Sequence, residues 1–263
     1  MRSNFERSRH ALFAAIALAG AMVANAPAQA QATVDVPRLA SGRPDFSGIW
    51  ETLSEADYDL EPHAGRRDAP PGPGVIHEGT IPYRPEALEQ RQRNFAARGE
   101  KDPRLRCWVL GVPRGVYYPA PFQIFQRDND VTLVHQFGHQ VRTIATNGSD
   151  HPVEKGQEFW LGDSRGYWEG DTLVVDVTDF NPDTWLDRAG NYHSENLHVV
   201  ERWRFVDRDT IAYSATLEDP KVFTRPWTMD VLLHRRRDLG FELIEDYCNT
   251  VEYERYYPHK DGQ

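Results

Sequence analysis

Short runs of alternating apolar and polar residues fill the chain after Pro121, and this pattern constrains the fold more than any other feature. The runs are separated by turn-forming pairs such as Asp128-Asn129 and Glu169-Gly170, with no helical pattern between them. Alternation with a period of two is typical of strands that bury one face. The predicted strands are 122–126, 131–137, 140–146, 166–168, 172–178, 197–206, 210–217, 227–235 and 241–251.

Consecutive hairpins place neighbours in sequence side by side in space, so the expected sheet is an antiparallel meander. Closing such a sheet removes its exposed edges. We therefore predict an all-β fold, a barrel of about ten strands, with a β-sandwich as the alternative. An opening strand begins at Gly48-Ile49-Trp50, and its Gly-x-Trp pattern resembles the first strand of lipocalin-like barrels.

The chain before the meander is irregular. Residues 54–83 are rich in Pro, Gly and charge, which disfavours regular structure. One short helix is predicted over 85–98, with Pro85 in its first turn and Gly99 at its end. We expect residues 54–121 to form a long arm that acts as a lid over the barrel mouth.

The amino terminus has the layout of a secretory signal peptide. Three arginines precede an apolar run over residues 11–24, and a small-x-small tripeptide follows at 28–30. The run is shorter than the roughly 20 residues that span a bilayer. We predict a signal peptide over 1–30 and a single barrel domain over 31–263. The mature protein is expected in the periplasm or outside the cell, without membrane insertion.

Net charge limits the partners. The formal charge is -10, and removal of residues 1–30, with three arginines and one glutamate, changes it to -12. Such a field repels polyanions. We expect a small-molecule ligand and no nucleic acid, while the sequence gives no indication of oligomeric state.

The two cysteines, Cys107 and Cys248, both lie in the mature part. An oxidising compartment permits a disulfide between them, which would tie the irregular first half to the last strand. Two separate buried thiols are the alternative. Neither has the spacing of a redox or zinc motif.

Three polar residues interrupt otherwise apolar faces of predicted strands: Glu201, Glu245 and His135. Alternation turns all three inward. A buried carboxylate must be paired or hydrogen-bonded, or its pKa rises. Pairing with Arg142 or Arg202 would satisfy the core without any chemistry, and a shift of one residue in register would turn these side chains outward.

The stretch from Trp160 to Trp203 is rich in tryptophans, acids and histidines. His193 and His198 are the candidate general bases because imidazole titrates near neutral pH. Asp187 is the candidate partner that fixes the tautomer. Glu201 or His151 is the candidate acid.

An aromatic wall with a few polar groups is the usual composition of a small-molecule site. Trp160, Trp168 and Trp185 are the predicted wall. The remaining candidate ligand contacts are polar: Arg202, His135 and Glu245.

Other chemistries fit the sequence less well. His193, His198 and Glu201 offer metal-binding atoms, but no HExxH pattern exists, and His198 and Glu201 face opposite sides of a strand. No Gly-x-Ser-x-Gly elbow is present. We therefore expect neither a metal nor another cofactor. Hydrolysis of glycosides by paired carboxylates stays open, with Asp176, Glu201 and Glu245 available.

Three motifs carry a resemblance to a family of uncharacterised exported bacterial proteins. They are SGIW at 47–50, WEGDTLVVD at 168–176 and HSxxLHVVER at 193–202. The match covers most of the mature chain. The resemblance implies one family-wide domain, and it implies no reaction and no residue role.

These features lead to three functional hypotheses. The first is an exported, cofactor-independent lyase, isomerase or hydratase that acts on a small apolar or aromatic molecule. The second is a periplasmic binding or carrier protein for an apolar ligand. The third is a metal-dependent hydrolase. Convergence of His151, His193, His198 and Glu201 on one cavity would favour an enzyme.

Overall fold

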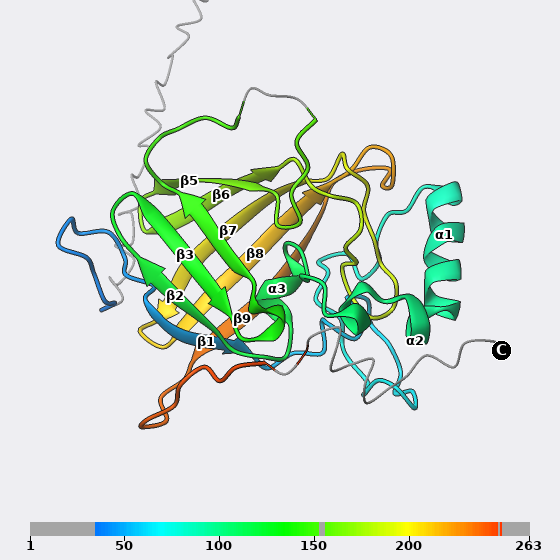
Figure 1. The fold of residues 1–263 in the computed structure, drawn as a ribbon, viewed down its shortest axis with the longest axis horizontal. Coiled ribbons are helices and arrows are strands. Elements are labelled where there is room, and N and C mark those ends of the chain that lie inside the picture. Colours follow the sequence, from blue (N-terminus) through cyan, green and yellow to red (C-terminus); the bar gives the residue numbers. More distant parts are fainter. Residues whose placement is uncertain (1–34, 153–155, 247, 249–263) are drawn as a thin grey trace, which may run out of the picture. The chain divides into compact units, whose positions relative to one another are not determined.

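Nine strands join edge to edge into a closed barrel within the described part of the chain (Figure 1). The computed structural model describes residues 35–152, 156–246 and 248, so the predicted signal peptide lies outside the described residues. The strands are β1 Gly48–Thr52, β2 Phe122–Gln126, β3 Asp130–His135, β4 Val141–Ala145, β5 Asp163–Glu169, β6 Thr172–Thr178, β7 His198–Asp207, β8 Thr210–Glu218 and β9 Trp227–Arg235. The predicted all-β barrel is confirmed, and its closed form is compatible with a lipocalin-like barrel.

One join in the barrel differs from the predicted meander. β4 and β5 run parallel and share the single pair Ala145↔Arg165, whereas every other join is antiparallel, including β9 to β1. A parallel join needs a crossover connection of a dozen or more residues. Residues 146–162 provide it in the sequence, and its described parts, 146–152 and 156–162, lie outside the strands (Figure 1).

The prediction of a last strand over 241–251 is wrong. Residues 241–246 contain no strand, and 247 and 249–251 lie outside the described residues. The reason is that β9 already pairs with β8 on one edge and with β1 on the other, so this closed barrel has no free edge for another strand. Glu245 is consequently exposed rather than inside an apolar row.

Apolar side chains fill the barrel interior. Alternation along β7 turns Val199, Glu201, Trp203 and Phe205 inward, and all four are buried. Toward one end, the space between Ile124, Leu133, Trp203 and their neighbours has no room for a water molecule. The interior is therefore packed at this end.

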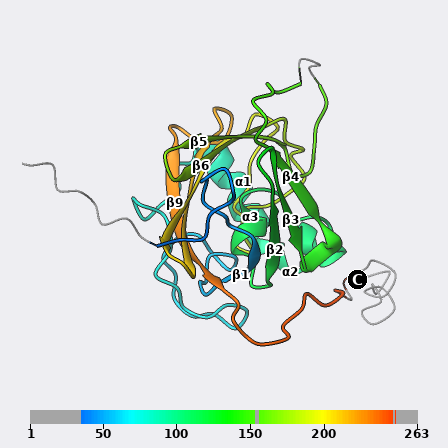
Figure 2. The same ribbon diagram turned by 90° about the vertical axis from the view of Figure 1, so that its left-hand side faces the viewer.

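The arm closes one end of the barrel. Its short helix α3 (Arg114–Tyr117) is buried throughout, and Figure 2 shows it between the β2–β4 side and the β9 side. Arg114 is 1 % exposed and forms ion pairs with Asp57 (2.8 Å) and Asp102 (3.0 Å). Buried opposite charges in contact satisfy each other. The arm therefore belongs to the folded core at this end.

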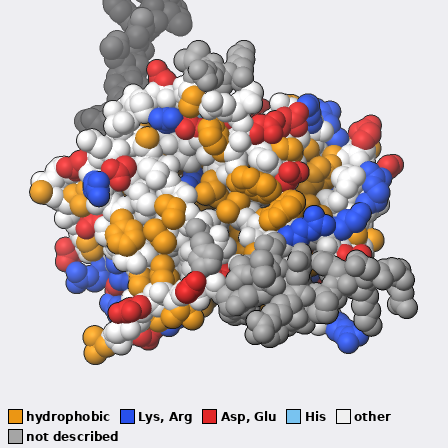
Figure 3. Space-filling view, in the orientation of Figure 1, with side chains coloured by type: hydrophobic (Ala, Val, Ile, Leu, Met, Phe, Trp, Pro, Cys, Tyr) orange, Lys and Arg blue, Asp and Glu red, His pale blue; other side chains and the backbone are white. Residues whose placement is uncertain are grey.

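The other helical segments are α1 Pro85–Ala96, α2 Arg98–Lys101, and the 3-10 turns Pro103–Arg106 and Phe137–His139. α1 ends two residues before the predicted end at residue 98, and Gly99 lies inside α2 rather than after a helix. Figure 3 shows Lys and Arg side chains gathered at the end of the view where α1 and α2 lie. No helix within residues 35–152 and 156–246 is long and apolar enough to cross a bilayer.

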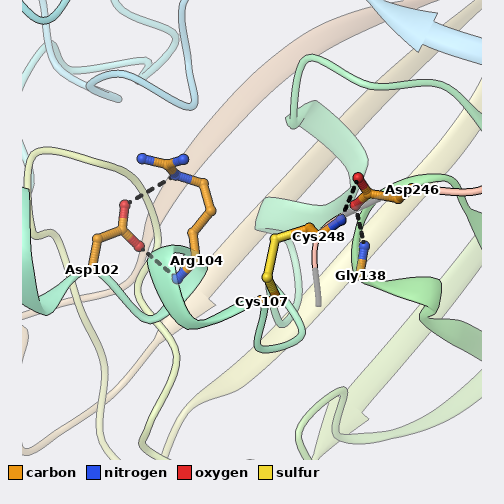
Figure 4. Close-up of a disulfide and its surroundings, with 6 residues drawn as sticks. All are labelled: Asp102, Arg104, Cys107, Gly138, Asp246 and Cys248. Carbon is orange, nitrogen blue, oxygen red and sulfur yellow. Dashed lines mark hydrogen bonds and ion pairs between the residues drawn. A yellow bond between two sulfur atoms is a disulfide. The ribbon is translucent and has the colours of Figure 1, made fainter. Parts of the chain in front are cut away.

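A disulfide joins Cys107 to Cys248 across 141 positions of sequence (Figure 4). It attaches the arm to the segment that follows the barrel. Asp246 supports the same attachment, because its carboxylate accepts hydrogen bonds from the backbone N–H groups of Gly138 (3.0 Å) and Cys248 (3.1 Å). The disulfide is confirmed, but its partner segment is not the expected strand.

We expect replacement of both cysteines by serine to lower the free energy of unfolding by about 2–5 kcal/mol, because the cross-link restricts a long loop in the unfolded chain. Urea denaturation of the wild type and the C107S/C248S variant measures the difference. A reducing agent should lower wild-type stability by the same amount and leave the variant unchanged. Equal stability of the two proteins would contradict the expectation.

Candidate functional site

The residues predicted for a site lie in three separate places. Glu201 and His135 are in the barrel interior, while His193 and Asp187 are buried beside the arm. His151 and His198 meet on the outer face of the barrel. His151, His193, His198 and Glu201 therefore do not converge on one cavity, and His151 and His198 share only a contact with the Asp176 carboxylate.

In the interior, Glu201 is fully buried and its carboxylate accepts three hydrogen bonds from two residues. Arg142 donates to both of its oxygens (3.0 and 2.5 Å), and the Tyr213 hydroxyl donates to Oε1 (2.7 Å). Arg142 also donates to the Ser164 hydroxyl from Nε (3.1 Å) and Nη2 (3.0 Å). The pairing of Glu201 with Arg142 is the core-satisfying alternative that the sequence left open.

His135 is also inward, at 7 % exposure, with its ring stacked on Phe122 at 5.2 Å. Burial and, secondarily, the positive charge of Arg142 lower the pKa of His135 to about 3. The ring therefore stays neutral at physiological pH. His135 and the exposed Glu245 border one hollow of about 400 Å³ between β3 and the segment after the barrel.

Beside the arm, His193 is 2 % exposed and both of its ring nitrogens have partners. Nε2 lies 2.7 Å from Thr184 Oγ1, and Nδ1 lies 2.9 Å from the Ser194 carbonyl oxygen. Nδ1 must be the donor because a carbonyl only accepts, so Nε2 accepts from the Thr184 hydroxyl. Burial lowers the pKa of His193, which favours this neutral form.

Asp187 is not the partner of His193 that the sequence predicted. Its oxygens accept hydrogen bonds from the Leu60 backbone (2.9 Å) and from the backbone (3.1 Å) and side chain (2.5 Å) of Asn191. Burial, and then the charge of Asp59, raise the pKa of Asp187 to about 7, and the hydrogen bonds oppose this shift. The carboxylate therefore holds two loops together, and its charge changes near neutral pH.

On the outer face, one carboxylate lies between two imidazoles. Asp176 of β6 contacts His198 Nε2 through Oδ2 (3.0 Å) and His151 Nε2 through Oδ1 (3.0 Å). His151 Nδ1 lies 2.6 Å from Asp163 Oδ2. We call Asp163, His151, Asp176 and His198 the outer His/Asp cluster. Its members come from β5, β6, the first residue of β7 and the connection between β4 and β5.

The outer His/Asp cluster is anchored at one end by Arg165. Its guanidinium donates to both oxygens of Asp163 (2.6 and 2.7 Å) and to the Ser149 hydroxyl (2.7 Å). Burial tends to raise the pKa of Asp163, but the hydrogen bonds from Arg165 and His151 outweigh it and lower this pKa. Asp163 therefore stays ionised opposite His151.

Sequence reasoning missed Asp163 and Arg165 as site residues, and considered Asp176 only as a glycosidase acid. Strand alternation is the signal that could have found them, because residues 163, 165 and 176 share the outer face. The position of His151 follows from no local pattern, since a long connection carries it to the sheet.

The three predicted wall tryptophans have different partners. Trp160 packs edge-on against Trp108 (5.2 Å), Trp168 stacks with Phe46 (5.9 Å), and Trp185 forms an isolated backbone bridge with Tyr192. Contacts within the described residues do not join them into one aromatic wall. Arg202 lies on the outer face and pairs with Glu169 (2.6 Å).

The predicted metal ligands are also apart. His193 is buried beside the arm and Glu201 lies inside the barrel, whereas His198 is on the outer face. Across the part of the chain that the structure describes, no group of three or more His, Cys, Asp or Glu side chains is arranged to hold a metal ion.

Comparison with known proteins does not assign the chain to a family. No protein-family model matches the chain, and no curated protein matches it. The three sequence motifs correspond to the opening of β1, the hairpin of β5 and β6, and the approach to β7. The functional argument therefore depends on the side-chain geometry.

We expect E201Q to lower the free energy of unfolding by about 3–5 kcal/mol, because it leaves the buried Arg142 guanidinium without a counter-charge. The glutamine still accepts from Tyr213. In R142M/E201Q the uncompensated charge is gone, so most of the stability should return. Urea denaturation measures both effects, and a double variant less stable than E201Q would contradict this account.

The raised pKa of Asp187 predicts a stability that depends on pH. The folded state favours the protonated acid, so this contribution is complete below the ordinary pKa of 3.8 and is lost as pH rises through about 7. The expected loss for this group is about 4 kcal/mol, at about 1.4 kcal/mol per pH unit.

Urea denaturation between pH 4 and pH 8 tests this expectation. D187N should be less stable than the wild type at pH 4 and should approach or exceed it at pH 8. The matched control is D183N, at an exposed position in the same loop, which should follow the wild-type profile. Parallel profiles for the wild type and D187N would contradict the expectation.

Proposed function

We propose that this protein is an exported enzyme that transfers protons on a small molecule at the outer His/Asp cluster. The observation that carries the proposal is the Asp176 carboxylate, which lies 3.0 Å from an imidazole nitrogen on each side. A carboxylate that holds an imidazole fixes its tautomer and stabilises the imidazolium that forms when the ring takes a proton.

His198 is the general base in this proposal. The ionised Asp176 only accepts, so the ring donates from Nε2, and the lone pair of the neutral ring is then on Nδ1. Nδ1 takes a proton from a carbon or oxygen of the substrate, and the positive charge that results faces Asp176. Return of this proton to another substrate atom gives isomerisation, and its delivery to a leaving group gives elimination.

His151 is a positioning residue. A protonated His151 ring donates to both Asp163 and Asp176, whereas a neutral ring donates to only one of them. Through its contacts with both carboxylates, His151 holds Asp176 in place opposite His198.

Accessibility favours this cluster over His193 and His135, the two buried candidates. The side chain of His198 is 37 % exposed and that of His151 is 28 % exposed, whereas His193 and His135 are buried. A base must reach its substrate. The disulfide supports export, since such bonds persist in oxidising compartments.

Deuterium exchange tests the proposal without knowledge of the natural substrate. A panel of small aromatic and aliphatic ketones is incubated with the protein in D2O, and loss of the C–H signal next to the carbonyl is followed by proton NMR. We expect exchange with the wild type, and a loss of about 10²–10⁴-fold in H198N, the range for a general base. D176N should also exchange more slowly than the wild type, and the pH dependence of its exchange rate should differ from that of the wild type.

The matched control is H63N. His63 is a partly buried histidine of the arm that bonds the Glu61 carbonyl oxygen, and its replacement should leave exchange unchanged. Circular dichroism checks that each variant is folded. Equal exchange rates in the wild type and H198N, whether fast or absent, would contradict the proposal.

A further inference from the structure

A groove of about 630 Å³ lies on the outer face of β7, β8 and β9, away from the outer His/Asp cluster. This volume is in the range of sites that hold a small organic molecule. None of the sequence-based hypotheses used it, although Arg202 lies at its border.

Short side chains form the floor of the groove. Ala212 and Ser214 face outward from β8, the middle strand of the three. The outward residues paired with them on β7 and β9 are longer: Arg204, Arg202, Leu232 and Asp230. Side chains stand roughly perpendicular to a sheet, so two long rows beside a short row leave a channel.

The wall on the β9 side is held by main-chain hydrogen bonds. The Asp230 N–H donates to the Val75 carbonyl (3.0 Å), and the His77 N–H donates to the Thr228 carbonyl (3.0 Å). His77 Nε2 also lies 2.6 Å from Asp230 Oδ2. The groove is therefore formed before any ligand binds, which lowers the entropic cost of binding.

The groove offers a guanidinium without a partner. Arg202 pairs with Glu169 (2.6 Å), but Arg204 makes no ion pair or hydrogen bond among residues 35–152 and 156–246. Asp230, the lining carboxylate, already faces His77. In a protein of formal charge -10, a free arginine in a preformed groove is suited to one anionic group, since its fork binds a carboxylate in two places.

The rest of the lining is partly apolar. Leu53 is 76 % exposed and Leu232 is 49 % exposed, and both border the groove together with Val75. Ser54 Oγ, in the same wall, has no hydrogen-bond partner among the described residues. An apolar surface beside one free cation matches a molecule with an apolar body and a single acid group.

We propose that the groove binds a small organic monoanion, with its carboxylate on Arg204 and its apolar body against Leu53 and Leu232. This site is separate from the proposed acid-base site. His198 and Arg204 are six residues apart on one face of β7, which at about 3.3 Å per residue is about 20 Å. Either site can therefore be disproved without the other.

Isothermal titration calorimetry with 4-phenylbutyrate tests the proposal, and the neutral 4-phenylbutanamide is the comparison ligand. We expect the wild type to bind the acid at least tenfold more tightly than the amide, with weakening at higher salt. R204Q should lose that preference, and L232S should weaken both ligands alike. In an NMR titration with the acid, the backbone amide signals of Arg204, Ala212 and Leu232 should shift.

The matched control is R208Q. Arg208 is an exposed arginine in the turn after β7 and does not line the groove. Its replacement should leave binding unchanged. Both arginines are exposed, so both variants should fold. Three results would overturn the proposal: no binding of the acid by the wild type, equal affinity in R204Q, or a dimer in sedimentation that buries the groove against a second copy.

Discussion

The buried ion pair between Arg142 and Glu201 is the interaction on which closure of the barrel depends. Backbone pairing between β4 and β5 is limited to one pair, so the wall is weakest at that join. From the inside, Arg142 of β4 bonds Ser164 of β5 and Glu201 of β7. Burial of this ion pair has a large desolvation cost, which close contacts and the additional Tyr213 hydrogen bond offset. On the outside, bonds from Arg165 of β5 to Ser149 and from Asp176 of β6 to His151 hold the connection between β4 and β5 against the wall.

A second buried arginine has the corresponding role at the covered end. Arg114 anchors α3 through Asp57 and Asp102, and Asp57 also binds Arg188 of the loop before β7. The arm and that loop are therefore held to each other by the buried carboxylate of Asp57, which is shared between Arg114 and the partly exposed Arg188. The partly exposed His–Asp pairs, by contrast, lie on the outside of the wall.

Local pattern explains much of what could be predicted from the sequence. Alternation set the bounds of β2, β6 and β9 correctly and turned Glu201 and His135 inward, since each depends only on residues within one strand. Pairing across the barrel could not be predicted. The apolar alternation after residue 240 suggested a strand. That strand would need a free edge of the sheet, and β1 already occupies the edge of β9. Likewise, closeness in sequence suggested His193 with Asp187, whereas the loop turns their side chains to different partners.

The single parallel join has a geometric consequence. Where strands share a ladder, their spacing is fixed by backbone hydrogen bonds at about 4.8 Å. Beyond the one pair of β4 and β5, the bond from the Arg142 guanidinium to the Ser164 hydroxyl joins the two strands on the inside. This join thus depends on the planar fork of one guanidinium, which bonds Ser164 and both oxygens of Glu201 at once, and the single nitrogen of a lysine at that position could not reproduce this geometry.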